Sequence, residues 1–147
     1  MPSDIDRSAP VLALHTRLID ARLEDLWRLH SEIDAWPSWQ ADIASAHLDG
    51  PFAAGSAFTW ATGGLTIASE IWQVMPQERT LWGGPANGIV GIHSWRFTPV
   101  GDGAVQVHTE ESWSGDPVDA DVAHMQELLD VSLESWLDHL DRAARVI

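Results

Sequence analysis

An alternation of apolar and polar residues with a period of two, from about Ala44 to Trp113, is the feature that most limits the fold. This pattern is typical of strands that bury one face of a sheet. The short glycine-rich breaks at 63–64 and 101–103 are typical of hairpin loops. The sequence therefore predicts a meander of six antiparallel strands at residues 44–50, 55–62, 65–75, 79–85, 89–100 and 104–113.

The segment before the meander predicts one more strand and two short helices. The apolar run 11–19 is typical of a strand, and Asp20 is placed to cap a helix that begins near Leu23. Pro37 disfavours a continuous helix but suits the first turn of a second one at 35–39.

The C-terminal segment predicts one long helix. Apolar residues recur at spacings of three and four from about Asp119 to Ala144, which is the pattern of a helix with one buried face. We expect an α+β fold in which a strongly curved, seven-stranded antiparallel sheet closes around this helix. Residues 1–9 are polar and are expected to be a flexible N-terminus, with residues 10–147 forming a single domain.

Composition excludes several classes of function. The chain has 22 acidic residues against eight basic ones, all arginine, and a net charge of −14. Such a surface repels phosphate groups and anionic lipids, so we expect no nucleic-acid partner. No apolar run approaches the length of a membrane span and no secretion signal is evident, so we expect no membrane insertion and a cytoplasmic protein. The oligomeric state is left open, and a homodimer is one alternative.

Two adjacent carboxylates lie in the segment HTEESWSG, residues 108–115. Neighbours on a strand point to opposite faces, so only one of the two can face the core. In the strand at 89–100 the large apolar residues, Trp95 and Phe97, have odd numbers, which makes the odd face the inner one. By the same rule Glu111 faces inward, and Glu110 faces outward toward water.

The hairpin at 101–103 pairs residues whose numbers sum to 204, which places His93 opposite Glu111 on the inner face. A buried carboxylate usually becomes neutral or finds a partner, and an imidazolium would supply one. Burial also raises the pKa of the carboxyl group, so the pair has the profile of a general acid and base. The alternative is a purely structural pair that anchors the last strand beneath the helix.

Further candidates follow from the inward parity of the strands and from the helix stripe. Each tryptophan taken alone is better explained by core packing than by contact with a ligand, although some of them together should line a cavity, and the hydroxyl groups are explained first by backbone hydrogen bonds. The seven histidines lack metal-binding spacings, so no metal site is predicted. The candidate ligand contacts are Trp36, Trp60, Ser69, Trp82, Trp95, Thr109, Trp113, Met125 and Leu129.

Several motifs carry a resemblance to a known family. They are F-x-W at 58–60, Trp82 with Gly84, H-x-W-x-F at 93–97, and T-E-E-S-W-x-G at 109–115. Together with Leu26-Trp27 and Trp36-Pro37-x-Trp39, they resemble the polyketide cyclase/dehydrase and lipid-transport group of the SRPBCC superfamily, over about residues 10–145. The resemblance implies a START-like helix-grip fold, in agreement with the element order predicted from periodicity.

The same resemblance implies an internal cavity for an apolar small molecule. Aromatase/cyclases of this type are thought to use an arginine and a tyrosine in the pocket, but this chain has no tyrosine, and Arg96 is on the outward parity. Our hypothesis is a protein that binds an aromatic or polyketide-like molecule and catalyses its cyclisation or dehydration, with Glu111 and His93 as catalytic residues and no cofactor. The alternative is a carrier or sensor of a hydrophobic small molecule without turnover.

Overall fold

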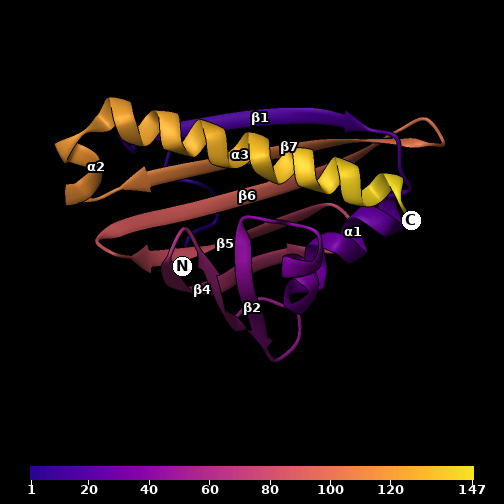
Figure 1. Ribbon diagram of the computed structural model, residues 1–147, viewed down its shortest axis with the longest axis horizontal. Helices are drawn as coiled ribbons and strands as arrows, with labels where there is room; N and C mark the ends of the chain where they lie inside the picture. The colour runs from indigo at the N-terminus through magenta and orange to yellow at the C-terminus, as the bar shows by residue number, and fades with distance from the viewer.

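The computed structural model describes residues 1–147 and consists of one open antiparallel sheet with a long helix packed across it (Figure 1). The sheet has seven strands in the order β1-β7-β6-β5-β4-β3-β2, so β1 and β2 form its edges. The predicted α+β fold is confirmed. The strands are β1 (Val11–Ile19), β2 (Ile43–Asp49), β3 (Ala57–Thr62), β4 (Leu65–Met75), β5 (Arg79–Ala86), β6 (Ile89–Val100) and β7 (Ala104–Ser114).

The helices follow the predicted order but differ in their ends. They are α1 (Leu23–Ser31), the 3₁₀ helix η1 (Ile33–Ser38), α2 (Asp116–Ala120) and α3 (Val122–Arg145). Asp20 does not cap α1, because Arg22 occupies the N-cap position and no side chain bonds there.

The single long helix predicted from about Asp119 to Ala144 is wrong at its start, because the chain breaks at Asp121. That residue has an extended backbone with φ of −157°, and its carboxylate accepts a hydrogen bond from the backbone N–H of His124. Asp121 therefore ends α2 and caps α3, which is a common role for aspartate.

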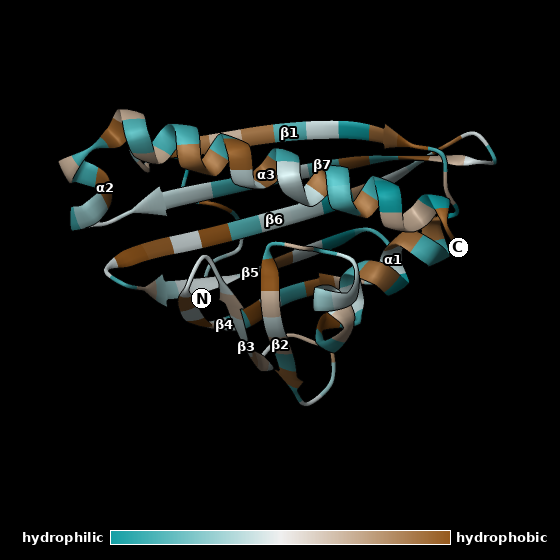
Figure 2. Ribbon diagram, viewed as in Figure 1, coloured by the Kyte–Doolittle hydropathy of each residue, from teal (hydrophilic) through white to brown (hydrophobic).

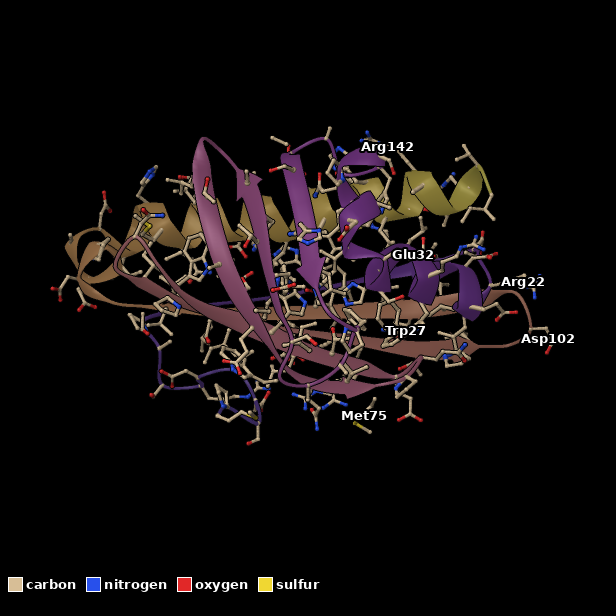
Figure 3. All side chains as sticks on the ribbon, turned by 90° about the horizontal axis from the view of Figure 1, so that it is seen from below. Arg22, Trp27, Glu32, Met75, Asp102 and Arg142 are labelled. Carbon is tan, nitrogen blue, oxygen red and sulfur yellow. The ribbon has the colours of Figure 1, made fainter.

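Helix α3 buries one apolar side against the sheet, and its polar side faces solvent, as the alternating colours along it show (Figure 2). Leu133, Trp136, Leu137 and Leu140 are buried, and burial of each such side chain contributes roughly 1.5–3 kcal/mol. Helix α1 closes one end of the sheet, where Trp27 lies with its ring 5.8 Å from that of Phe97 (Figure 3). No helix is both long and apolar enough to cross a membrane.

The N-terminal segment differs from the expected flexible end. Ile5 is buried with Leu81 and Ile92, on the face of the sheet that points away from α3. Arg7 donates a hydrogen bond to Glu110, and the backbone N–H of Asp6 donates to Ser112. Apolar packing of Ile5 and two polar contacts together hold residues 5–7 on the sheet.

Candidate functional site

A pocket of about 380 Å³ lies between the sheet and α3. Its volume falls in the range of small-molecule sites, roughly 300–1,000 Å³. Strands β3 to β7, the hairpin turns after β3 and β5, and helix α3 supply its walls. The lining residues are Trp60, Thr62, Gly63, Leu65, Ile67, Ser69, Trp82, Gly83, Gly84, Ala86, Asn87, Ile89, Gly91, His93, Glu111, Trp113, Leu128, Ser132 and Trp136.

Glycines in β5 and β6 hollow out one wall of the pocket. Gly84 pairs directly with Gly91, and Gly83 precedes them. A Cβ at Gly83, which has φ of +156°, would lie 2.0 Å from the carbonyl oxygen of Gly91, so only glycine fits there. A Cβ at Gly91 would lie 3.4 Å from Oε2 of Glu111. The missing side chain therefore leaves space beside this carboxyl group.

Glu111 lies on the inner face and lines the pocket, as its parity predicts. The indole N–H of Trp113 donates a 2.6 Å hydrogen bond to its Oε2, and Nδ1 of His93 lies 3.1 Å from its Oε1. Only 15% of the Glu111 side chain is accessible. The predicted pairing of His93 with Glu111 is confirmed by the strand register.

Burial moves the pKa values of both groups toward their neutral forms. It raises the pKa of Glu111 to about 7, although the hydrogen bond from Trp113 acts in the opposite direction. Burial, with a smaller contribution from His30, lowers the pKa of His93 well below its ordinary value of 6.5. The expected imidazolium is therefore wrong: His93 is neutral, and Glu111 is the member of the pair that titrates near neutral pH.

His93 contacts two side chains through its two ring nitrogens. Its Nε2 lies 2.7 Å from the hydroxyl oxygen of Thr109, and its Nδ1 faces Glu111. A neutral imidazole has one donor and one acceptor nitrogen, and the threonine hydroxyl can take either role. His93 can therefore serve both the ionised and the protonated form of Glu111.

The pocket contains some of the predicted ligand contacts and not others. Trp60, Ser69, Trp82 and Trp113 line it beside His93 and Glu111. Trp36 and Trp95 do not, because both are fully buried among other aromatic rings. Leu129 and Met125 pack instead with Val11 in a second apolar cluster near the start of α3, and Thr109 lies behind His93.

Sequence reasoning missed several lining residues. Leu128, Ser132 and Trp136 come from α3, and none of the three was among the predicted ligand contacts. Glycines within β5 and β6 were a usable signal, because glycine in a strand often marks the close approach of a ligand or of backbone.

Glu110 was expected to meet water, and this expectation is wrong. The residue is 8% exposed, because the N-terminal segment covers it. Arg7 donates to its Oε2 at 2.7 Å, and His108 contacts its Oε1 at 2.8 Å. These contacts outweigh the effect of burial and hold the pKa of Glu110 below its ordinary value.

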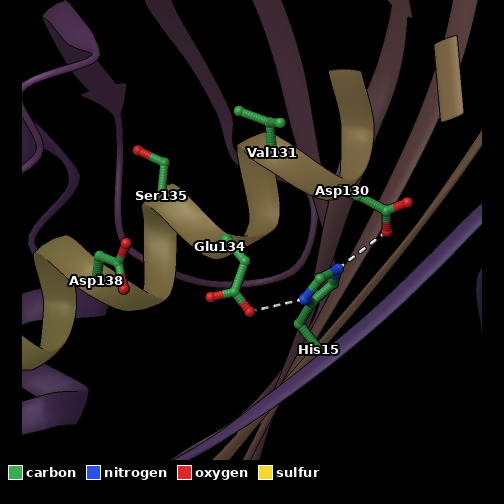
Figure 4. Close-up of a pocket in the computed structure, with 6 residues that line it drawn as sticks. All are labelled: His15, Asp130, Val131, Glu134, Ser135 and Asp138. Carbon is green, nitrogen blue, oxygen red and sulfur yellow. Dashed lines mark hydrogen bonds and ion pairs between the residues drawn. The ribbon is translucent and has the colours of Figure 1, made fainter. Parts of the chain in front are cut away.

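A second depression, of about 390 Å³, lies on the outside of the molecule between β1 and α3 (Figure 4). His15 contacts Asp130 and Glu134 there, each at 2.9 Å. These polar groups are partners for one another, and they join the edge strand to the helix. The depression therefore lacks the enclosed apolar wall of the first pocket.

Comparison with known proteins places the chain in a family. The sequence profile of the family described as polyketide cyclase/dehydrase and lipid transport matches residues 13–145. The chain belongs to this family. No curated protein sequence matches the chain significantly.

Several solved structures share the fold of this chain at low sequence identity. The hypothetical protein jhp0584 from Helicobacter pylori is 16% identical, with a TM-score of 0.82 over 95% of this chain and 91% of that chain. A START superfamily protein from Mycobacterium smegmatis is 11% identical, with a TM-score of 0.77 over 91% and 97%. The di-domain ARO/CYC BexL from the BE-7585A biosynthetic pathway is 17% identical, with a TM-score of 0.76 over 91% of this chain and 46% of that one.

Proposed function

We propose that the protein binds a small aromatic or polyketide-like molecule in the pocket between the sheet and α3, and catalyses its cyclisation or dehydration by proton transfer. The observation that carries the proposal is Glu111, a carboxyl group with a pKa of about 7 that lines an otherwise largely apolar pocket. Membership of the polyketide cyclase/dehydrase and lipid transport family, and the likeness to the ARO/CYC protein BexL, support it.

Glu111 is suited to act as both base and acid. A group whose pKa lies near the working pH is present in both forms, and such catalysis contributes about 10²–10⁴-fold in rate. The carboxylate takes a proton from the carbon next to a ligand carbonyl, which gives an enolate and a carboxylic acid. In a cyclisation the enolate carbon bonds to a second carbonyl carbon of the ligand, and the carboxylic acid gives the proton to the alkoxide oxygen that this forms. In a dehydration the carboxylic acid gives the proton to the departing hydroxyl group, which leaves as water while the enolate electrons form the carbon–carbon double bond.

Trp82 becomes a donor for the oxygen of that enolate if its ring turns toward the ligand, because its indole nitrogen has almost no accessible surface in the structure. It lines the pocket, and its buried indole N–H makes no hydrogen bond within the protein. An unpaired buried donor costs about 1–3 kcal/mol, and a ligand oxygen would remove this cost. His93 acts as a positioning residue, because it reaches the reaction through Glu111.

Exchange of the α-protons of β-tetralone, a bicyclic aromatic ketone, tests the proposal. We expect the protein to accelerate exchange into D₂O, measured by NMR, and Glu111→Gln to lower that rate about 10²–10⁴-fold. The affinity for the ketone, measured by quenching of the pocket tryptophans, should change only a few-fold. Glu110→Gln is the matched control, because it makes the same change on the opposite face of β7.

The carrier or sensor alternative predicts a different outcome of the same experiment. In that case the ketone binds, but the wild-type protein does not accelerate exchange beyond buffer. This result would overturn the catalytic part of the proposal and leave the binding part intact. Full exchange activity in Glu111→Gln would remove this carboxyl group from the mechanism.

A further inference from the structure

The pocket holds a carboxyl group but no positively charged side chain. None of the eight arginines lines it, and the chain has no lysine. The one histidine in its wall, His93, is buried and neutral. Glu111 is therefore the only charged group in the wall, and no cation of the protein contacts it.

Glu111 also keeps acceptor capacity for a ligand. A carboxylate has about four acceptor positions, and the protein uses at most two of them, through Trp113 and His93. The space left by Gly91 lies next to Oε2. The unused capacity is therefore on a carboxyl group that a ligand in the pocket can approach.

Indole rings surround the same space. Trp60 and Trp82 meet with centroids 5.8 Å apart and an interplanar angle of 88°. Trp136 meets each of them at 6.4 Å, inclined by 58° and 66°. Trp60, Trp82 and Trp136 therefore line the pocket in different orientations, and Trp113 is the fourth tryptophan in its wall. Indole is the aromatic group that attracts a cation most strongly when the cation lies within about 6 Å of the ring centre.

We infer that the pocket selects ligands that carry a protonated nitrogen on an apolar skeleton, with the ammonium group against Glu111 and among the indole rings. The inference rests on the proposed function, because it takes the same pocket as the ligand site. It narrows the ligand class to apolar amines. Anionic molecules of the same shape are disfavoured when Glu111 is ionised, since no cation in the wall neutralises a second negative charge.

The negative net charge of the whole molecule also favours cationic ligands over anionic ones. A net charge of −14 raises the local concentration of organic cations and lowers that of anions.

Inside the pocket an ammonium group would stabilise the ionised form of Glu111, whose pKa burial raises to about 7. Glu111 contacts the neutral His93 of β6 and Trp113 of its own strand, β1 pairs Ala13 with it, and α3 contributes Leu128, Ser132 and Trp136 to the same pocket. None of them carries charge, so the carboxyl group sets the pH dependence.

A series of three probes with one carbon skeleton tests the inference. Phenylbutylamine is a cation near neutral pH, phenylbutanol is neutral, and phenylbutyrate is an anion. We expect the amine to bind at least about tenfold more tightly than the alcohol, measured by quenching of tryptophan fluorescence and by calorimetry, and the acid to bind more weakly than either. The affinity for the amine should fall from about pH 8 to about pH 5, while that for the alcohol changes little.

Two variants test whether the preference for the amine depends on Glu111. Glu111→Gln should bring the amine to the affinity of the alcohol, and Glu110→Gln, on the outer face, should leave the preference intact. Circular dichroism establishes that each variant is folded, and the three-probe comparison in the wild-type protein does not depend on either variant. Binding of the alcohol as tightly as the amine would overturn the inference and leave the proposed function standing. Absence of binding by all three probes would contradict both.

Discussion

Glu110 and Glu111 are neighbours on β7, the side chains of both have little accessible surface, and their pKa values move in opposite directions. Glu110 contacts the guanidinium group of Arg7, which holds its pKa below the ordinary value. Glu111 has an indole N–H and a neutral imidazole as neighbours, and its pKa rises to about 7. The two carboxylates differ in enclosure and in access to a cation: burial is the largest cause of the raised pKa of Glu111, whereas Arg7 and His108 offset burial at Glu110 and hold it in its ionised form.

The largest expected effect concerns stability at Glu111. Its folded-state pKa of about 7 lies above the ordinary value of 4.5, so its neutral form favours folding. This contribution is complete below the ordinary pKa and is lost as the pH rises through about 7, for a total of about 3 kcal/mol. Glu111→Gln stays neutral, so it should be more stable than wild type by up to about 3 kcal/mol at about pH 8, with little difference at about pH 4.

Urea unfolding of both proteins at the two pH values measures this difference. A variant that is less stable than wild type at the higher pH would show that Glu111 has a stabilising partner in its ionised form. Glu110→Gln provides the contrast. Its folded pKa is lowered, so its ionised form stabilises the protein above the ordinary pKa, and that contribution is lost as the pH falls.

The second prediction concerns the N-terminal segment that covers Glu110. Ile5 is buried against Leu81 and Ile92, and Ile5→Ala should lower the free energy of unfolding by about 2 kcal/mol, at the lower end for core truncations. The same change should increase hydrogen exchange of the backbone amide of Asp6, which donates to Ser112. An unchanged stability would mean that the N-terminal segment does not depend on this side chain for its position.

The smallest expected change in stability is that caused by replacing Arg7. The side chain of Arg7 is 60% exposed, so its ion pair with Glu110 contributes at most about 1 kcal/mol. Arg7→Gln should cost no more than this in urea unfolding, yet it should raise the pKa of Glu110, because the largest lowering contact is removed. If the pKa of Glu110 does not rise, the difference between the two carboxylates has another cause.

The sheet and the inward position of Glu111 could be predicted from the sequence, because both follow from a strict period of two. The bounds of β4 and β6 agree with the predicted 65–75 and 89–100. The register of β6 with β7 follows from one loop length, which pairs His93 with Glu111. Local pattern and turn length are enough wherever an element is set by its own sequence.

The predictions that were wrong concern features that depend on contacts between residues far apart in the sequence. Arg7 and Glu110 are 103 positions apart, and nothing in either local sequence indicates their contact. The neutral state of His93 depends on how completely the neighbouring rings enclose it, with Trp82 at 4.7 Å and Trp95 at 5.1 Å between ring centres. Parity also cannot separate a residue that lines a pocket from one that is packed behind it, which is why Trp95 was predicted as a ligand contact.

The central claim is that Glu111 is a carboxyl group that changes protonation state near neutral pH within the pocket. A pH titration of the side-chain carboxyl carbons by ¹³C NMR, with Glu111→Gln to assign the signal, measures this directly. We expect a pKa of about 7 for Glu111, and a pKa below the ordinary 4.5 for Glu110 in the same experiment. A Glu111 signal that titrates at or below 4.5 would show that this carboxyl group is ionised at neutral pH and would contradict its role in proton transfer.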